Sequence, residues 1–226
     1  MKPVVLVGAG DQARIGRVLM EEDSNYQVVA FSAHEAHINS TTLLGLDVVP
    51  FERIETLFPP SDFALCVAMG FAQVNKVRAG IYDQCVAMGY EMVSYVSSRA
   101  IAWGEHTIGK SSWVFESCVV HPFVQVGNDV SIGPGCILGH DVVIGDHCFI
   151  APGVVMLGRV EIGPYCFVGA NAMLRNGVKV APECVIGAGA NILEDTVERG
   201  VYSVASTPAA NTTSDMLSPF FGMTRR

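Results

Sequence analysis

A six-residue period runs from Ile108 to Thr196 without a slip and constrains the fold of this chain more than any other feature. Every sixth residue from Ile108 to Ile192 is aliphatic or methionine, which gives fifteen consecutive repeats. Glycine follows this residue in eight repeats, and the fifth position is always Ser, Cys, Val, Ala or Thr. A unit this short cannot bury its own apolar side chain, so the units must wrap into coils that stack. The period therefore predicts a parallel β-helix over residues 99–199.

With three repeats in each coil, fifteen repeats predict five coils, each rising by about 4.8 Å, the spacing of paired strands. We expect the aliphatic residue to point inward and the small fifth-position residue to fill a narrow interior. The glycine is expected to supply backbone freedom near each bend. Five of the seven cysteines occupy the fifth position and are expected to be buried as small apolar residues.

Composition narrows the class of protein. Of the 226 residues, 50% are hydrophobic and 16% are charged, which is typical of a folded chain with one large or two modest domains. A net charge of −8, with a basic cluster only at the terminal Arg225 and Arg226, argues against a nucleic acid partner. No signal peptide or membrane-length apolar run is recognisable, so we expect a cytoplasmic chain with no membrane partner. The cysteine spacing does not suggest a metal.

The N-terminal part, residues 1–98, begins with a strand, a glycine turn and a helix. The apolar run at residues 3–7 leads into Gly8-Ala9-Gly10, and a helix is expected from Asp11 to about Glu22. This order opens many nucleotide-binding units, in which backbone N–H groups at the start of the helix hold phosphate. The turn lacks the third glycine of GxGxxG, and a tight turn needs small residues in any case. Phosphate binding and a purely structural turn both remain open.

Further strands and a helix follow in alternation. We expect strands at residues 27–31, 63–68 and 91–96 and a helix at residues 72–88. The alternation predicts a Rossmann-like α/β domain with a small parallel sheet. Ligands of such sheets bind beyond the carboxyl ends of the strands, so Gly8 to Ala13, Ser32 to His34 and Gly70 should meet at one crevice.

Residues 97–107 are expected to link the two parts, and residues 200–226 to form an irregular tail. The tail contains Pro208, Pro219 and the pair Phe220-Phe221. We expect these aromatic residues to pack as a flap on the chain itself or on a neighbouring subunit.

His140 is the strongest candidate for chemistry. It is followed by Asp141 at an expected outward bend of the β-helix. A neutral imidazole beside a carboxylate is a natural general base, because the carboxylate favours proton uptake and fixes the orientation of the ring. A surface histidine beside an acid is also common without any function. His147 is expected to face outward as well, and His34 and His37 to lie in a solvated loop.

Small residues stack near this histidine. Gly158 has the same position as His140 three repeats later, one coil along, so it leaves room beside the imidazole and exposes an N–H that a reacting carbonyl oxygen needs. Ala170 and Ala188 form a similar column on another side, where a slim ligand could lie. Turns need small residues without any function, so the structural interpretation stays open.

Residues 3 to about 209 resemble a bacterial family of sugar acyltransferases. It includes sialic acid O-acetyltransferases and the N-acetyltransferases of nucleotide-linked 4-amino-4,6-dideoxy sugars in the bacillosamine and perosamine pathways. The resemblance rests on GAGDQA at residues 8–13, the fifteen repeats, HDVVIGDHCFIAPG at residues 140–153 and Thr207-Pro208-Ala209.

The resemblance implies a left-handed β-helix and a homotrimer with acetyl-coenzyme A between adjacent subunits. His140 would be the general base and Asp141 its acidic neighbour, while the Gly158 N–H would hold the thioester oxygen. Ala170 and Ala188 match positions that contact the coenzyme.

The N-terminal domain of the family binds a nucleotide sugar. Gly10, Asp11 and Gln12 match its phosphate turn, and Gly70 matches a glycine at the end of the third strand. Gly8 and Ser32 are expected to contact the same ligand. Two departures stand out. Where the family often has a second histidine that contacts the coenzyme or acetyl group, this chain has Phe149. Where the second strand usually ends in an acidic pair, it ends in Ser32-Ala33-His34, which puts the identity of the nucleotide in question.

The leading hypothesis is acetyl transfer from acetyl-coenzyme A to an amine, expected at C4, of a nucleotide-linked deoxy amino sugar for a bacterial surface glycan such as lipopolysaccharide O-antigen. Direct attack is expected, because no cysteine occupies an outward position to carry the acyl group. A sugar O-acetyltransferase is one alternative, and a non-catalytic trimeric binding protein is another. A metal enzyme of the γ-carbonic anhydrase kind needs three convergent imidazoles, but His121, His140 and His147 differ in their positions within the repeat.

Overall fold

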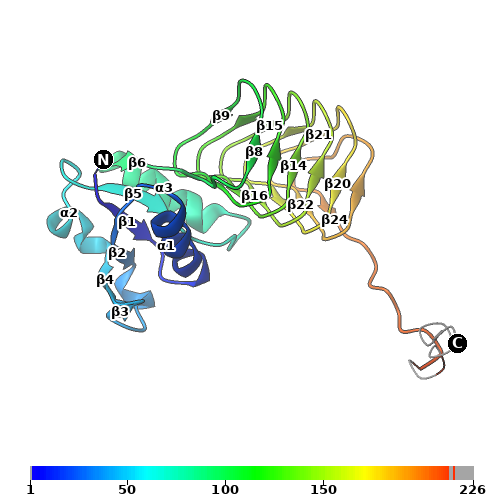
Figure 1. Cartoon of the computed structure of the whole chain (residues 1–226). Coiled ribbons are helices and arrows are strands. Elements are labelled where there is room, and N and C mark those ends of the chain that lie inside the picture. Colours follow the sequence, from blue (N-terminus) through cyan, green and yellow to red (C-terminus); the bar gives the residue numbers. More distant parts are fainter. Residues whose placement is uncertain (1, 214–215, 217–226) are drawn as a thin grey trace, which may run out of the picture.

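The computed structural model describes residues 2–213 and residue 216, and it contains two parts that lie side by side (Figure 1). An α/β domain occupies the N-terminal end, and a three-sided parallel β-helix follows it. Among the described residues, no helix has the length and apolar character needed to cross a membrane. Pro219, Phe220 and Phe221 lie outside the described residues.

The β-helix consists of three parallel sheets, which we call faces 1, 2 and 3. Each coil adds one two-residue strand to each face. Face 1 contains β7 (Tyr95–Val96), β10 (Trp113–Val114), β13 (Ser131–Ile132), β16 (Phe149–Ile150), β19 (Phe167–Val168), β22 (Val185–Ile186) and β24 (Val201–Tyr202). Face 2 contains β8 (Ile101–Ala102), β11 (Val119–Val120), β14 (Ile137–Leu138), β17 (Val155–Met156), β20 (Met173–Leu174) and β23 (Asn191–Ile192). Face 3 contains β9 (Thr107–Ile108), β12 (Gln125–Val126), β15 (Val143–Ile144), β18 (Glu161–Ile162) and β21 (Lys179–Val180).

The repeats form β9 to β23, and their register confirms the predicted β-helix. Each strand pairs with the strand three repeats later, as Val119 pairs with Ile137. The second residue of each strand points inward and joins a continuous core, which the fifth-position cysteines also enter at 0% exposure. The stack extends beyond the repeats, because β7 and β8 precede them and β24 follows them. Residues 97–107 therefore form part of the first coil, and face 1 has seven strands where five coils were expected.

The glycines that follow the inward residues have a different role from the one expected. A Cβ atom on Gly109 would fall on the backbone of Gly127, one coil along, and the Cβ of Gly139 would fall on the backbone of Gly158. Close stacking of the coils therefore requires these glycines. The left-handed backbone lies two positions later in each bend, for example at Asp141 (φ 59°) and His147 (φ 61°).

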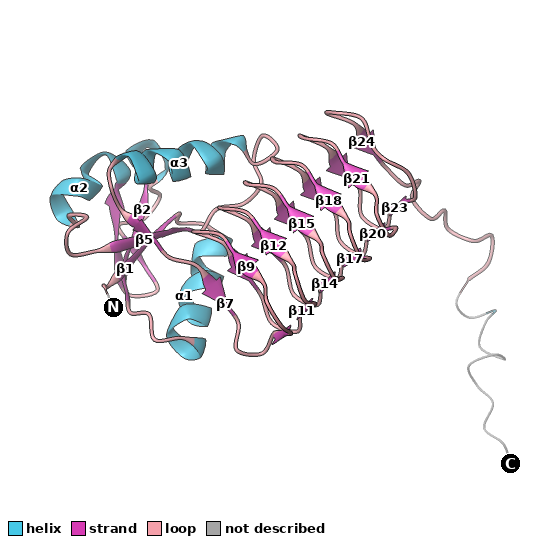
Figure 2. Ribbon diagram, turned by 90° about the horizontal axis from the view of Figure 1, so that it is seen from above, coloured by secondary structure: helices cyan, strands magenta, loops and turns pink. Residues whose placement is uncertain are grey.

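The α/β domain has a six-stranded sheet in the order β3-β4-β2-β1-β5-β6, which confirms the predicted α/β class. Its strands are β1 (Val4–Val7), β2 (Val28–Ala33), β3 (Thr42–Leu43), β4 (Leu46–Pro50), β5 (Ala64–Val67) and β6 (Glu91–Met92). Its α-helices are α1 (Asp11–Asp23), α2 (Ile54–Leu57) and α3 (Lys76–Ala87), with short 3-10 helices at Glu35–His37 and Phe51–Arg53. Alternate residues of β1 enter two different cores, so the sheet is covered on both sides, by α1 on one and α3 on the other (Figure 2).

Three boundaries differ from the sequence-based expectation. β2 continues to Ala33, so Ser32 belongs to the strand. The strand expected at residues 91–96 is two strands, because β6 completes the α/β sheet and β7 begins the β-helix. The helix expected from Ala72 begins at Lys76, because the three residues before it have left-handed φ angles of 52°, 51° and 67°. The antiparallel hairpin of β3 and β4 was not predicted.

Trp113 on face 1 joins the two parts. Its indole N–H donates to the backbone oxygen of Val67 at 2.8 Å, at the end of β5. The N–H of Val67 in turn donates to the Ser111 hydroxyl at 2.9 Å. Helix α1 crosses the indole at Gly16, where a Cβ atom would collide with the ring. These contacts fix the α/β domain against the first coils of face 1.

Candidate active site

His140 and Asp141 lie at the edge where face 2 meets face 3, between β14 and β15. The Nδ1 atom of His140 is 2.7 Å from the Asp141 Oδ2 atom, and both side chains are about half exposed, at 47% and 50%. An ionised carboxylate only accepts hydrogen bonds, so Nδ1 carries the proton in this pair. The Nε2 atom is then left to accept a proton from a bound molecule.

Gly158 lies directly against this Nε2 atom. The three atoms nearest to a Cβ built on Gly158 all belong to the His140 imidazole, and none of them leaves room for a methyl group. Within the described chain, the Gly158 N–H donates no hydrogen bond. The edge therefore offers a proton acceptor and a main-chain donor next to each other, as the stacking of the repeats suggested.

Ala170 and Ala188 occupy a different edge, where face 1 meets face 2. A Cβ atom on Gly169 would touch the backbone of Ala188, so the coils are closely stacked there as well. Within a single chain, the His140–Asp141 pair and the two alanines therefore lie on separate edges of the β-helix.

A pocket of about 760 Å³ lies in the α/β domain beyond the carboxyl ends of β1, β2 and β5. The structure brings all the expected N-terminal residues to its wall: Gly8, Gly10, Asp11, Gln12, Ser32 and Gly70. Ala33 and His34, which were also expected at this crevice, line it together with His37, and His37 remains exposed to solvent as expected. The volume suits a ligand of nucleotide size.

The turn after β1 has a conformation that lets a ligand come close to its backbone. Gly8 has φ 141°, and a Cβ atom there would collide with the backbone oxygen of Ala68. Gly10 precedes the first turn of α1, and a Cβ atom there would have open space around it. Gly10, Asp11 and Gln12 line the pocket, so the N-terminus of the helix lies at its wall. The Ser32 hydroxyl is fully buried at the pocket wall and has no hydrogen-bond partner in the described chain. An unpaired buried hydroxyl at this position indicates a place for a polar ligand group.

Glu52 is a neighbour of the pocket that sequence analysis missed. Its Oε1 atom lies 2.8 Å from the Nδ1 atom of His34, and its Oε2 atom accepts the N–H of Glu35 at 3.2 Å. Its own backbone N–H and the His34 ring lower the pKa of this carboxyl. A carboxylate therefore does lie at the end of β2, although it comes from the separate 3-10 helix at Phe51–Arg53 and no local motif marks it.

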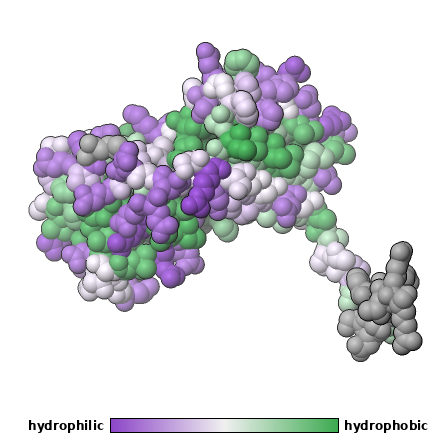
Figure 3. Space-filling view, in the orientation of Figure 1, coloured by the Kyte–Doolittle hydropathy of each residue, from purple (hydrophilic) through white to green (hydrophobic). Residues whose placement is uncertain are grey.

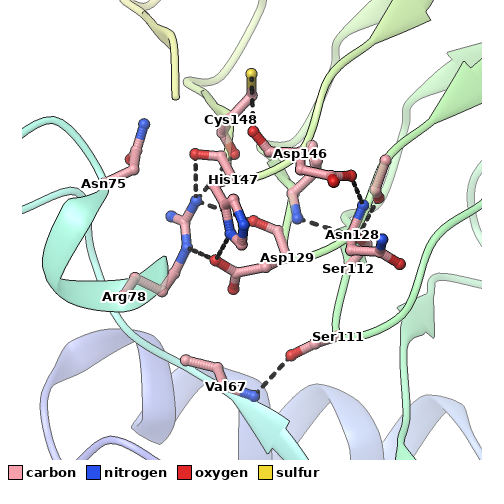
Figure 4. Close-up of polar contacts among 12 residues, drawn as sticks. Val67, Asn75, Arg78, Ser111, Ser112, Asn128, Asp129, Asp146, His147 and Cys148 are labelled. Carbon is pink, nitrogen blue, oxygen red and sulfur yellow. Dashed lines mark hydrogen bonds and ion pairs between the residues drawn. The ribbon is translucent and has the colours of Figure 1, made fainter. Parts of the chain in front are cut away.

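His147 is buried at the edge between face 3 and face 1, which corrects the expectation that it faces outward. It is 7% exposed, and its ring stacks on Tyr165 with centroids 4.9 Å apart. Its Nδ1 atom lies 2.9 Å from the Oδ2 atom of Asp129, one coil earlier (Figure 4). Helix α3 covers this edge, so His147 is part of the junction between the two parts of the chain.

Arg78 of α3 completes this junction. Its Nε atom donates to Asp129 at 3.0 Å, and one Nη atom donates to the backbone oxygens of Asp129, His147 and Cys148 (Figure 4). Arg78 is 2% exposed and Asp129 is 1% exposed. A buried charge pair of this kind fixes the direction in which α3, and hence the pocket, points.

Phe149 lies on face 1, where it packs between rings from both parts of the chain. Its centroid is 5.0 Å from that of Phe71 and 5.8 Å from that of Phe167. The guanidinium of Arg78 lies 5.9 Å from the Phe149 centroid. Phe149 is thus not on the same edge as His140 of its own chain.

In the part of the chain that the structure describes, no three His, Cys, Asp or Glu side chains gather in a way that could hold a metal ion. All seven cysteines are free and buried.

Comparison with known proteins agrees with this architecture. The profile of the bacterial transferase hexapeptide family (six repeats) matches residues 123–158 and 159–194. No curated protein matches the sequence. The acetyltransferase domain of PglB from Neisseria gonorrhoeae FA1090 has a similar structure, with a TM-score of 0.81 and 21% identity over 90% of this chain and 97% of that chain.

Two further structures are similar. PerB from Caulobacter crescentus, in complex with CoA and GDP-perosamine, has a TM-score of 0.81 and 20% identity over 90% of this chain and 95% of that chain. WeeI from Acinetobacter baumannii AYE has a TM-score of 0.56 and 18% identity over 93% and 99% of the two chains. The chain is thus a left-handed parallel β-helix protein with bacterial transferase hexapeptide repeats, preceded by a Rossmann-like domain, and it shares this fold with the acetyltransferase domain of PglB and with PerB.

Proposed function

We propose that this protein is an acetyl-coenzyme A-dependent N-acetyltransferase that acts on the amine of a nucleotide-linked deoxy amino sugar, at C4, for a bacterial surface glycan. The observation that carries the proposal is the His140 pair. An imidazole held by Asp141 at 2.7 Å presents its free nitrogen beside the unbonded N–H of Gly158. This arrangement suits proton removal and oxyanion stabilisation at one reacting carbon.

The pocket of the α/β domain supports a nucleotide-linked acceptor. A diphosphate fits the glycine turn and the N-terminus of α1, where Gly8, Gly10, Asp11 and Gln12 lie. The buried Ser32 hydroxyl, which has no partner among the described residues, would bond the ribose or base once a bound ligand reaches it. PerB, which has the same fold, was solved with CoA and GDP-perosamine.

Face 2 supports a homotrimer. Its outward residues are apolar through five coils, in the order Ile101, Val119, Ile137, Val155 and Met173. Ile101 is 51% exposed and Ile137 is 39% exposed, and Figure 3 shows hydrophobic residues gathered along the β-helix. On face 3 four of the five outward residues are polar, namely Thr107, Gln125, Glu161 and Lys179, and the last two form an ion pair at 3.2 Å. An exposed apolar stripe of this length is typical of a surface that a second copy covers.

The same geometry supports an active site between subunits. The α/β domain packs on face 1, while His140 lies on the edge opposite face 1. The sugar pocket and the base of one chain therefore point away from each other. In a trimer, the base of one subunit serves the pocket of its neighbour, and acetyl-coenzyme A lies in the cleft between them, along Ala170 and Ala188 and with Phe149 near the acetyl end.

The reaction proceeds by direct attack. The sugar amine forms a bond to the thioester carbonyl carbon as His140 Nε2 takes its proton, and the Gly158 N–H binds the carbonyl oxygen as it becomes negative. The C–S bond then breaks, and the imidazolium returns its proton to the departing thiolate. The products are the sugar amide and free coenzyme A.

A thiol-release assay tests this function. Acetyl-coenzyme A is supplied with a panel of nucleotide-linked 4-amino sugars, and the acetylated product is identified by mass spectrometry. We expect turnover with at least one amino sugar and a fall in kcat of about two to four orders of magnitude for His140→Ala. Near-normal turnover of that variant would remove His140 from the mechanism. Product that carries an ester in place of an amide would indicate O-acetylation, and no thiol release with any acceptor would favour a binding protein.

A further inference from the structure

A short loop connects the sugar pocket to the β-helix and holds an exposed phenylalanine. It runs from Gly70, which lines the pocket, to Lys76, which lines it again at the start of α3. Between them, Gln73, Val74 and Asn75 all have left-handed φ angles, although none is a glycine. Non-glycine residues adopt this conformation in succession only where surrounding contacts impose it.

Asn75 imposes that conformation by anchoring the loop to the β-helix. Its side chain is fully buried, and its Nδ2 atom donates to the backbone oxygen of Cys166 at 3.0 Å. The next residue, Lys76, bonds Glu183 on the same edge at 2.6 Å. The loop is therefore held in a single position relative to both the pocket and face 1.

Phe71 is the residue that this loop presents. Its ring is 4.7 Å from the Phe167 centroid and 5.0 Å from the Phe149 centroid, yet it remains 51% exposed. The two inner rings stack on each other, and Arg78 lies near Phe149, so the outer ring rests on a rigid support. We call Phe71, Phe149 and Phe167 the aromatic wall.

The aromatic wall lies next to the rim of the pocket, because Phe71 directly follows Gly70, which lines the pocket, and packs on two residues of face 1. In the proposed binding mode the diphosphate lies at the start of α1 and the sugar extends past Gly70 toward Phe71. The C–H face of a pyranose and a C6 methyl group are apolar and pack well on an aromatic ring. A C6 hydroxyl group would meet the exposed ring of Phe71, which offers it no hydrogen bond.

We infer that Phe71, supported by Phe149 and Phe167, determines sugar specificity by contacting the apolar face and C6 methyl group of a 6-deoxy sugar. The inference rests on the proposed function and adds to it the residue that selects the deoxy sugar. It assigns a role to an exposed ring that the packing of a single chain does not explain.

The test compares two acceptors and one fragment on the full-length protein. The acceptors are the nucleotide-linked 4-amino-4,6-dideoxy sugar that the wild type uses best and its counterpart with a C6 hydroxyl, and the fragment is the parent nucleoside diphosphate. For Phe71→Ala we expect KM for the deoxy sugar to rise about ten- to a hundredfold and the preference over the hydroxyl sugar to shrink by a similar factor. Kd for the nucleoside diphosphate and KM for acetyl-coenzyme A should stay within about twofold of the wild type.

Two further variants keep the result interpretable. Phe71→Leu retains an apolar side chain and should keep part of the preference, while Leu44→Ala removes an equally exposed apolar residue (47%) on the β3–β4 turn and should change nothing. Equal loss of nucleoside diphosphate and sugar binding would show that Phe71 only shapes the loop. An unchanged preference, or a rise in KM for acetyl-coenzyme A alone, would overturn the inference. If the wild type binds no nucleoside diphosphate, it is the proposed function that fails.

Discussion

The imidazole of His140 lies against the backbone of Gly158, one coil further along the β-helix, so closely that no side chain fits at position 158. The His140 ring is half exposed and can rotate away, and Gly158 does not have a positive φ angle, so alanine is compatible with the backbone. We predict that Gly158→Ala leaves the free energy of unfolding within about 1 kcal/mol of the wild type, because the displaced ring is on the surface.

The same substitution should lower kcat about ten- to a thousandfold, because it moves the base and crowds the N–H beside it. Steady-state kinetics measures this effect. Asn176→Ala, one coil further along the same edge, is the matched control and should retain activity. A Gly158→Ala enzyme with wild-type kcat would show that the two groups do not act together.

Gly10 offers a way to separate folding from nucleotide binding. It caps α1 without a side-chain hydrogen bond, and the space around it is open. Aspartate is a good N-cap residue, so we predict that Gly10→Asp keeps or slightly raises the melting temperature. Its negative charge would lie where the diphosphate binds, so affinity for nucleoside diphosphates should fall strongly.

Calorimetric titration and thermal unfolding of the same sample test both parts of this prediction. Gly10→Asn, which caps the helix without a charge, is the control and should bind more tightly than Gly10→Asp. Similar affinity of the two variants would place the phosphates away from α1.

Removing one partner of the buried Arg78–Asp129 pair should lower the free energy of unfolding strongly. We predict that Asp129→Ala destabilises the protein by about 3–5 kcal/mol, because it leaves the guanidinium without its carboxylate partner at the domain junction. The double variant Arg78→Met and Asp129→Ala should be less destabilised than the sum of the two single variants. Denaturant unfolding measures these free energies, and strictly additive effects would contradict a coupled pair.

Asp23, at the end of α1, predicts a pH dependence of stability. The hydrogen bonds from Ser98, Tyr95 and Ser97 hold the pKa of its carboxyl well below the ordinary range. A group whose pKa is lower in the folded state stabilises the fold above its unfolded pKa, and that contribution is lost as the pH falls. Asp23→Asn should therefore be less stable than the wild type at pH 7.

This difference should shrink once the pH falls below about 4, the ordinary pKa of aspartate. Denaturant unfolding of both proteins between pH 7 and pH 3 provides the comparison. A difference that stays constant over this range would show that the lowered pKa does not contribute to stability.

The six-residue period predicted the β-helix because every repeat obeys the same local rule. Inward positions such as Val142 and Cys148 were identifiable from their place in the repeat alone. The position of Gly158 beside His140 followed from the same period, since three repeats make one coil, and Asp141 is the next residue in the chain.

Contacts between the two parts of the chain were not predictable in this way. His147 has an outward position in its repeat, yet α3 covers it, and nothing near residue 147 shows that a helix from residues 76–87 packs there. Glu52 reaches His34 from another segment for the same reason. The glycines that follow inward residues were recognised from the repeat, but the reason for them was not. They are required because the backbone of the next coil lies too close for a Cβ atom, and no single repeat reveals that contact.

Complementation between two inactive variants tests whether the active site is shared between subunits. His140→Ala lacks the base and Gly10→Asp lacks the phosphate site, and each alone should be nearly inactive. If the base of one subunit serves the pocket of its neighbour, co-expression should restore about a quarter of wild-type activity, because one site in four in randomly mixed trimers has both intact parts. Isolated mixed trimers with no activity above that of the single variants would contradict a site shared between subunits.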